Sequence, residues 1–115
     1  MWRYRAELAV RGEPVSLGEG NTPLVEQEQW LLKVEGFSPT GSFKDRGAAT
    51  TITAARAAGA TTVVEDSSGN AGTSIAAYAA AAGLKARIFA PDDIIPSKAR
   101  AIRALGAPSA LQTSC

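Results

Sequence analysis

The sequence contains no histidine and only one cysteine, Cys115. Because histidine is the base in Ser-His-Asp triads and in Cys-His pairs, neither of these nucleophile systems can be built from this chain. The lack of histidine also removes the commonest zinc ligand, which a single cysteine cannot replace. A lone cysteine has no partner for an internal disulfide, so the composition gives no support for an oxidising compartment.

The sequence also lacks a strong net charge and a long apolar run. Its net charge of +1 gives no electrostatic reason to expect nucleic acid or an acidic membrane surface as a partner. The charged N-terminus does not suit a secretory signal, and no apolar stretch reaches membrane-spanning length. We expect a soluble, cytoplasmic chain whose 115 residues, 45% of them hydrophobic, form one small core.

From Gly36 onward, helical patterns alternate with short strands. We expect helices over 45–58, over 71–82 and from about residue 97 to Gly106, separated by strands over 61–65 and 86–90. A glycine follows each expected helix, as suits a left-handed terminator. Strands joined by crossover helices predict an α/β fold with a doubly wound parallel sheet. The residues expected to face the core from the three helices are Ala48, Ile52 and Ala55, then Ile75, Tyr78 and Ala82, then Ala99, Ile102 and Leu105.

The two ends of the chain depart from this pattern. Residues 30–35 predict a strand, whereas 18–24 are rich in turn-forming residues and are expected to be irregular. After Ala107 the alternation calls for another apolar strand, but residues 108–115 are mostly polar and make a poor central strand. We therefore divide the chain into an N-terminal segment (1–35), a partial αβ-repeat domain (36–107) and an atypical tail (108–115).

The first candidate site residue is Lys44, in the loop Ser42-Phe43-Lys44-Asp45-Arg46-Gly47. Lysine is usually a solvated surface residue, and that interpretation is the alternative. With Ser42 as a helix cap, however, Lys44 lies at the positive end of the helix, which disfavours its protonated form. The charge of Arg46 also disfavours the protonated form of Lys44, whereas that of Asp45 favours it. Since a lysine must lose its proton to attack an aldehyde, this position permits Lys44 to act as a nucleophile.

The second candidate site is the loop Ser67-Ser68-Gly69-Asn70-Ala71-Gly72, which joins an expected strand to the next helix. Ligands of open α/β sheets bind at the carboxyl ends of strands, and unpaired N–H groups at a helix start suit a carboxylate or a phosphate. The alternative is an ordinary connection capped by serine or asparagine. A metal would lack hard ligands here. Neither loop has the spacing of a dinucleotide or nucleoside-triphosphate motif.

Taken together, these segments resemble the pyridoxal-phosphate enzymes of the tryptophan-synthase-β-like fold, and most closely the threonine synthases. The order and spacing of the segments carry the resemblance, which runs from about Leu17 to Ala107. The matching segments are residues 18–24 (GEGNTPL), 32–36 (LKVEG), 39–47 (PTGSFKDRG) and 67–72 (SSGNAG), followed by the helix that contains Ala76, Ala77 and Tyr78.

The resemblance implies pyridoxal 5'-phosphate as cofactor, with the protein supplying orientation and proton transfer. Lys44 would hold the cofactor covalently and move protons at the substrate carbons. Asn70 would hydrogen-bond the ring oxygen of the cofactor, and Phe43 would pack beside the ring, unless Phe43 belongs to the core. The carboxylate of a small amino-acid substrate would be received by Ser67, Ser68, Gly69, Asn70 and Ala71.

The implied reaction is that of a lyase in threonine biosynthesis, because Asp45 and Arg46 after the lysine favour the threonine synthases. These enzymes convert O-phosphohomoserine and water to threonine and phosphate. The alternative is a threonine or serine dehydratase, or a β-replacement enzyme similar to cysteate synthase. The sequence leaves the oligomeric state open, and a homo-oligomer is compatible with it.

The chain also departs from the family pattern. Family members are far longer, and two of their features have no match here: the glycine-rich loop that clamps the cofactor phosphate and the group that faces the pyridine nitrogen. We therefore expect a truncated or frame-shifted product, or a fragment, that binds the cofactor weakly or not at all on its own. A non-catalytic remnant that pairs with a relative through an exposed sheet edge is the alternative from another functional class.

Overall fold

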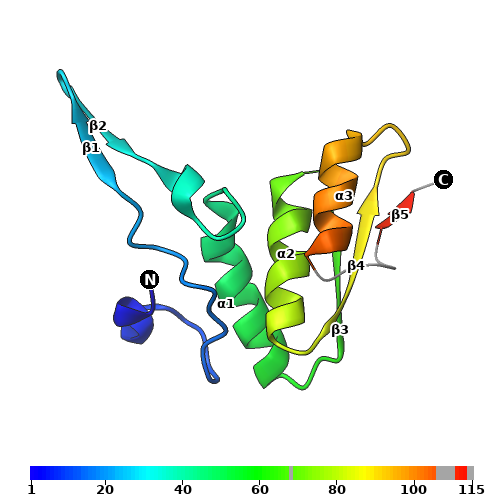
Figure 1. Cartoon of the computed structure of the whole chain (residues 1–115). Helices are drawn as coiled ribbons and strands as arrows, with labels where there is room; N and C mark the ends of the chain where they lie inside the picture. Colours follow the sequence, from blue (N-terminus) through cyan, green and yellow to red (C-terminus); the bar gives the residue numbers. More distant parts are fainter. Residues whose placement is uncertain (68, 106–110, 114–115) are drawn as a thin grey trace.

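The computed structural model describes residues 1–67, 69–105 and 111–113 (Figure 1). Three α-helices, α1 (Lys44–Ala57), α2 (Asn70–Ala81) and α3 (Pro96–Ala104), alternate with the strands β3 (Thr62–Asp66), β4 (Lys85–Ala90) and β5 (Leu111–Thr113). Before them come a 3₁₀ helix η1 (Trp2–Glu7), a hairpin of β1 (Leu24–Gln27) and β2 (Trp30–Lys33), and a short 3₁₀ turn η2 (Glu35–Phe37).

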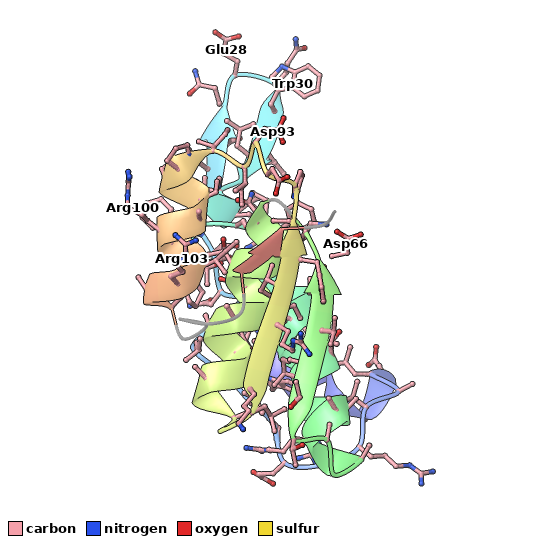
Figure 2. The ribbon with its side chains drawn as sticks, turned by 90° about the vertical axis from the view of Figure 1, so that its right-hand side faces the viewer. Glu28, Trp30, Asp66, Asp93, Arg100 and Arg103 are labelled. Carbon is pink, nitrogen blue, oxygen red and sulfur yellow. The ribbon has the colours of Figure 1, made fainter. Side chains whose placement is uncertain are left out.

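The strands β3, β4 and β5 form one parallel sheet in that order, which confirms the predicted α/β architecture. Helices α2 and α3 lie on one face of this sheet, and α1 packs against α2 on the side away from the strands (Figure 1). The opposite face of the sheet carries no helix in the described part of the chain and is turned toward the viewer in Figure 2. Among the described helices, none has the length and apolarity needed to cross a membrane.

The expected helices and strands between residues 44 and 104 agree with the structure to within one or two residues at most of their ends. The glycine terminators explain this agreement. Gly59 and Gly83 directly follow the C-cap residues of α1 and α2 and adopt φ values of +79° and +72°, in the left-handed region where a side chain would be strained. Gly106, which was expected to end α3, lies outside the described residues.

The core lies between α2 and its neighbours. Ile52 of α1, Tyr78 of α2, Ile88 of β4 and Ile102 of α3 are fully buried. Gly72 lets α2 approach β4 closely, because a Cβ there would lie 2.9 Å from Cγ2 of Ile88. The expected inward faces are therefore confirmed at most of their positions, with Ala55 and Ala82 partly buried.

One core prediction was wrong. Leu105 is 39% exposed, although the spacing of the third helix placed it on the inward face. The helix ends at Ala104, so Leu105 is its C-cap residue and leaves the helical face that Ala99 and Ile102 bury.

The predictions for the two ends of the chain need correction. Residues 18–23 form no helix or strand, as expected, but Leu24 begins strand β1, which was not predicted and pairs antiparallel with β2. Strand β2 ends at Lys33 rather than at residue 35. A strand also forms in the tail, where none was expected: β5 pairs in parallel with β4 from Leu111 to Thr113. Backbone groups make these pairings, so side-chain polarity is a weak guide to a short strand at the edge of a sheet.

A buried carboxylate joins the N-terminal segment to the core. Glu19 is 4% exposed, and its side chain accepts hydrogen bonds from Nε1 of Trp2 (2.7 Å), the hydroxyl of Ser16 (3.1 Å) and N–H of Leu17 (3.0 Å). The buried hydroxyl of Tyr78 donates the fourth, at 2.7 Å. Burial pushes the pKa of Glu19 upward, but these hydrogen bonds outweigh it and leave the pKa below its ordinary value. Burial and the bond to Glu19 raise the pKa of Tyr78.

We predict that Tyr78→Phe lowers the free energy of unfolding by about 2 kcal/mol, because it removes one hydrogen bond to a buried charged group. Urea denaturation followed by circular dichroism measures the change. Tyr4→Phe is the matched control, since Tyr4 is half exposed. Equal losses in the two variants would show that the bond between Tyr78 and Glu19 does not stabilise the fold.

Candidate functional site

Lys44 is the first residue of α1, directly after the N-cap residue Phe43. Ser42, the cap expected from the sequence, lies one residue before the N-cap position, and no side-chain hydrogen bond caps α1. Its hydroxyl accepts a hydrogen bond from the backbone N–H of Lys44 at 3.3 Å. Lys44 is exposed, and its Nζ lies 5.0 Å from the centre of the Phe43 ring. Phe43 is itself 58% exposed, so the alternative that it belongs to the core is wrong.

A hollow of about 170 Å³ lies beside Lys44. Lys44, Gly47, Ala48 and Thr51 line it from α1, at the i, i+3, i+4 and i+7 spacing of a single helix face. The opposite wall consists of Ala71 and Ile75 of α2 and Glu65 of β3. Small residues leave this space open. A Cβ on Gly47, for example, would meet nothing within 4 Å.

The second predicted loop reaches this hollow at one residue, Ala71. Asn70 begins α2 and is exposed, and its Oδ1 accepts a hydrogen bond from Nζ of Lys98 at 2.7 Å. Gly69 is the N-cap residue of α2, and no side-chain hydrogen bond caps the helix there. The expected alternative of a serine or asparagine cap at this position is therefore not what the structure has.

The remaining residues of the loop lie around that helix start. The hydroxyl of Ser67 accepts a hydrogen bond from the N–H of Gly69 at 3.2 Å. Ser68 lies outside the described residues. The structure thus brings Lys44 and Ala71 together at one hollow, with Asn70, Gly69 and Ser67 preceding Ala71 along the chain.

Five lining residues were missed as site residues: Gly47, Thr51 and Glu65, together with Ala48 and Ile75, which were expected only to face the core. Gly47 and Thr51 could have been found, because they follow Lys44 at helical spacing on the same face. Glu65 depends on tertiary structure. It sits at the end of β3 opposite Ile88, whose buried side chain marks the face of the sheet that the helices cover.

Asp45, the residue after Lys44, is fully buried and fixes the start of α1. Its carboxylate accepts hydrogen bonds from the backbone N–H of Thr40 (2.7 Å), from the Thr40 hydroxyl and from the hydroxyl of Ser74 (2.6 Å). Ser74 belongs to α2, so this one side chain ties the loop before α1 to both helices. Its carboxylate is directed into the protein rather than toward the solvent around Lys44.

Arg46 forms the second anchor. Its Nε and Nη2 each donate to the carboxylate of Glu35 at 2.9 Å and so form a bidentate pair. The same carboxylate accepts a hydrogen bond from the hydroxyl of Thr22 at 2.6 Å. The hydrogen bonds from Arg46 and Thr22 lower the pKa of Glu35 to about 2, and the pairing raises the pKa of Arg46. Arg46 thereby holds the loop before β1 and the turn after β2 against α1.

The residues around the Lys44 hollow fit an aldehyde cofactor better than a metal ion. In the described part of the chain, no group of three or more histidine, cysteine, aspartate or glutamate residues could hold a metal. By contrast, an exposed amine borders a hollow lined largely by small and apolar residues, next to the start of α2. Such a helix start favours the negative charge that a cofactor phosphate or a substrate carboxylate carries.

A family model described as "Pyridoxal-phosphate dependent enzyme" matches residues 15–111. The chain belongs to this family. The family depends on pyridoxal phosphate, which confirms the cofactor expected from the sequence. Similar solved structures are enzymes with the tryptophan-synthase-β-like fold, of which this chain represents a part.

Threonine synthases are among the curated relatives. The enzyme of Synechocystis sp. is 40% identical over 104 residues, a match that covers 80% of this chain and 27% of the relative. The enzyme of Mycobacterium leprae is 44% identical over 98 residues, covering 76% of this chain and 27% of the relative. The chain thus spans about a quarter of the length of these curated relatives.

Two solved structures show the same likeness. An O-ureido-L-serine synthase has a TM-score of 0.71 at 34% identity, covering 81% of this chain and 32% of that one. A hydrogen sulfide-producing enzyme of Fusobacterium nucleatum has a TM-score of 0.74 at 31% identity, covering 83% of this chain and 34% of that one. The family resemblance seen in the sequence is therefore confirmed, together with the fold.

We predict that Glu35→Gln makes stability less dependent on pH in acid. Because the folded-state pKa of Glu35 is depressed to about 2, its contribution is complete above its ordinary value of 4.5 and is lost as the pH falls toward 2. The variant should therefore unfold at lower urea than the parent chain near pH 6, and the difference should shrink near pH 3.

Glu28→Gln is the control, because Glu28 lies between β1 and β2 at the tip of the hairpin (Figure 2) and forms no ion pair in the described part of the chain. A difference between Glu35→Gln and the parent chain that stays constant over this pH range would contradict the prediction.

Proposed function

We propose that this chain supplies the lysine side of a threonine-synthase site, in which O-phosphohomoserine and water give threonine and phosphate. The observation that carries the proposal is the hollow that Lys44 shares with Ala71, since it joins the two loops that the family resemblance selects. The identity of about 40% to relatives named threonine synthase favours this reaction within the family.

In this proposal, Lys44 is the residue that holds the cofactor and carries protons between substrate carbons. The exposed position of its amine at the edge of the hollow suits both tasks. When bound, the cofactor supplies an electron sink for charge that develops on the substrate. Phe43 packs beside the cofactor ring, consistent with its exposed ring close to Nζ of Lys44.

The start of α2 binds the substrate and orients the cofactor. Asn70 donates from its amide nitrogen to the ring oxygen of the cofactor, while its Oδ1 is held by Lys98. The substrate carboxylate is received by side chains and backbone N–H groups of the loop, which are those of Ser67, Ser68, Gly69, Asn70 and Ala71.

A β-replacement enzyme is the second candidate function. It is favoured by the names of the similar solved structures, which include an O-ureido-L-serine synthase and an O-acetylserine-dependent cystathionine β-synthase from Helicobacter pylori. These are 28–34% identical to this chain, below the 38–44% of the threonine synthases. A dehydratase and a non-catalytic fragment are the remaining alternatives.

We predict that pyridoxal phosphate followed by borohydride labels Lys44 ahead of Lys33, Lys85 and Lys98. Peptide mapping of the reduced protein measures the labelled positions, and Lys44→Ala should abolish the visible absorbance of the bound cofactor. We expect weak binding, because the chain covers about a quarter of its relatives' length. Labelling spread evenly over the four lysines would instead indicate a family fragment without the chemistry.

We predict that Gly47→Leu abolishes this labelling while the chain remains folded. The new side chain would enter the open space beside Gly47, and leucine favours a helix over glycine by roughly 0.5–1 kcal/mol. Ala80→Leu, at an exposed position near the end of α2, is the matched control and should label normally. Equal labelling of Lys44 in both variants would show that the cofactor does not use this hollow.

A further inference from the structure

A second and larger hollow, of about 500 Å³, lies on the other side of the start of α1. It is lined by Met1, Arg3 and Tyr4 of the N-terminal segment, Asn21, Lys33 and Arg46. It shares no lining residue with the hollow of Lys44. Its size is within the range of roughly 300–1,000 Å³ that is usual for small-molecule sites.

Three of its six lining residues are cations, and their hydrogen-bonding capacity is only partly used. Arg46 binds Glu35 and Thr22 through Nε and Nη2, which leaves Nη1 without a partner in the described part of the chain. Lys33 donates to the backbone oxygen of Thr22 and has further N–H groups to offer. The guanidinium of Arg3 lies 4.7 Å from the centre of the Tyr4 ring and makes no ion pair among the described residues.

The carboxylates nearby do not neutralise this cluster. The carboxylate of Glu35 is already paired with Arg46 and Thr22. The carboxylate of Glu19 is buried, and its hydrogen bonds come from the N-terminal segment and Tyr78. The three cations outnumber the carboxylates of Glu35 and Glu19 by one, so an excess of positive charge remains for an anionic ligand to balance.

The absence of a side chain at Gly20 keeps the hollow's walls together. Gly20 has φ of +92°, and a Cβ there would lie 2.9 Å from the backbone nitrogen of Met1 and 3.4 Å from Nη1 of Arg46. The N-terminal segment that carries Arg3 and Tyr4 is thereby held directly beside the free nitrogen of Arg46. The cluster is thus a product of the fold rather than of neighbouring sequence.

We propose that this hollow binds a phosphorylated small molecule, with the phosphoryl group against Arg3, Lys33 and Nη1 of Arg46. A phosphomonoester carries about 1.5–2 negative charges near neutral pH and offers three strong acceptor oxygens to these donors. The hydroxyl of Tyr4 and the amide of Asn21 add polar groups, and the half-exposed Tyr4 ring offers an apolar face to the organic part of the ligand. This site does not depend on the proposed chemistry at Lys44.

The test is a titration of the isotope-labelled chain with inorganic phosphate and, separately, with glycerol phosphate at constant ionic strength. The amide chemical shifts are measured by NMR at each concentration. We expect saturable shifts at Tyr4 and Asn21, and none at Lys85 or Arg103, which line neither hollow. Arg3→Glu should weaken binding by about tenfold or more, because it replaces one charge-assisted donor by a like charge. Arg100→Glu, on the exposed side of α3 (Figure 2), makes the same charge change away from the hollow and should leave binding unchanged.

Two outcomes would overturn the proposal. One is a linear drift of all shifts with phosphate, and the other is an equal loss of affinity in Arg3→Glu and Arg100→Glu. If Arg3→Glu fails to fold, Lys33→Gln takes its place, with Lys85→Gln as the matched control on β4. Cofactor labelling of Lys44 is read out separately, so failure at one hollow is distinguishable from failure at the other.

Discussion

The placement of the site depends on one buried carboxylate, that of Asp45. Three hydrogen-bond donors converge on it, from Thr40 and from Ser74 of α2, and the side chain is fully removed from solvent. Since an unpaired buried charge costs several kcal/mol, these donors must stay in place for α1 to begin where it does. The start of α1 is therefore fixed against α2, and the position of Lys44 relative to Ala71 follows from that.

Helix geometry explains how three consecutive residues serve three purposes. Successive side chains on a helix point about 100° apart. Lys44 consequently borders the small hollow, Asp45 enters the core, and Arg46 reaches Glu35 and the larger hollow. The sequence Lys44-Asp45-Arg46 thus has a structural meaning for its last two residues. Asp45 and Arg46 fix the start of α1, and the start of α1 positions Lys44.

Local patterns were sufficient to predict α1, β3, α2, β4 and α3, because each has helical or strand periodicity and two of the helices end at a left-handed glycine. The same periodicity could have added Gly47 and Thr51 to the site. Strand β2 was expected, but its partner β1 and the edge strand β5 were missed, since short strands are specified by their pairing partners. The partners of Glu19 and Arg46 were also out of reach, because Tyr78 and Glu35 are 59 and 11 residues away in the sequence.

The two hollows differ in the chemistry of their walls, which are largely apolar around Lys44 and cationic around Arg46. Around Lys44 the walls are small and largely apolar, so the amine is the main reactive group present. On the other side, Arg46 donates to Glu35 through Nε and Nη2, and its Nη1 has no partner among the described residues. Lys33 donates to the backbone oxygen of Thr22 and has further N–H groups. The ion pair that holds the loops in place therefore also leaves Nη1 of Arg46 available as a donor at their surface. The anchoring of α1 and one donor of the larger hollow thus come from the same side chain.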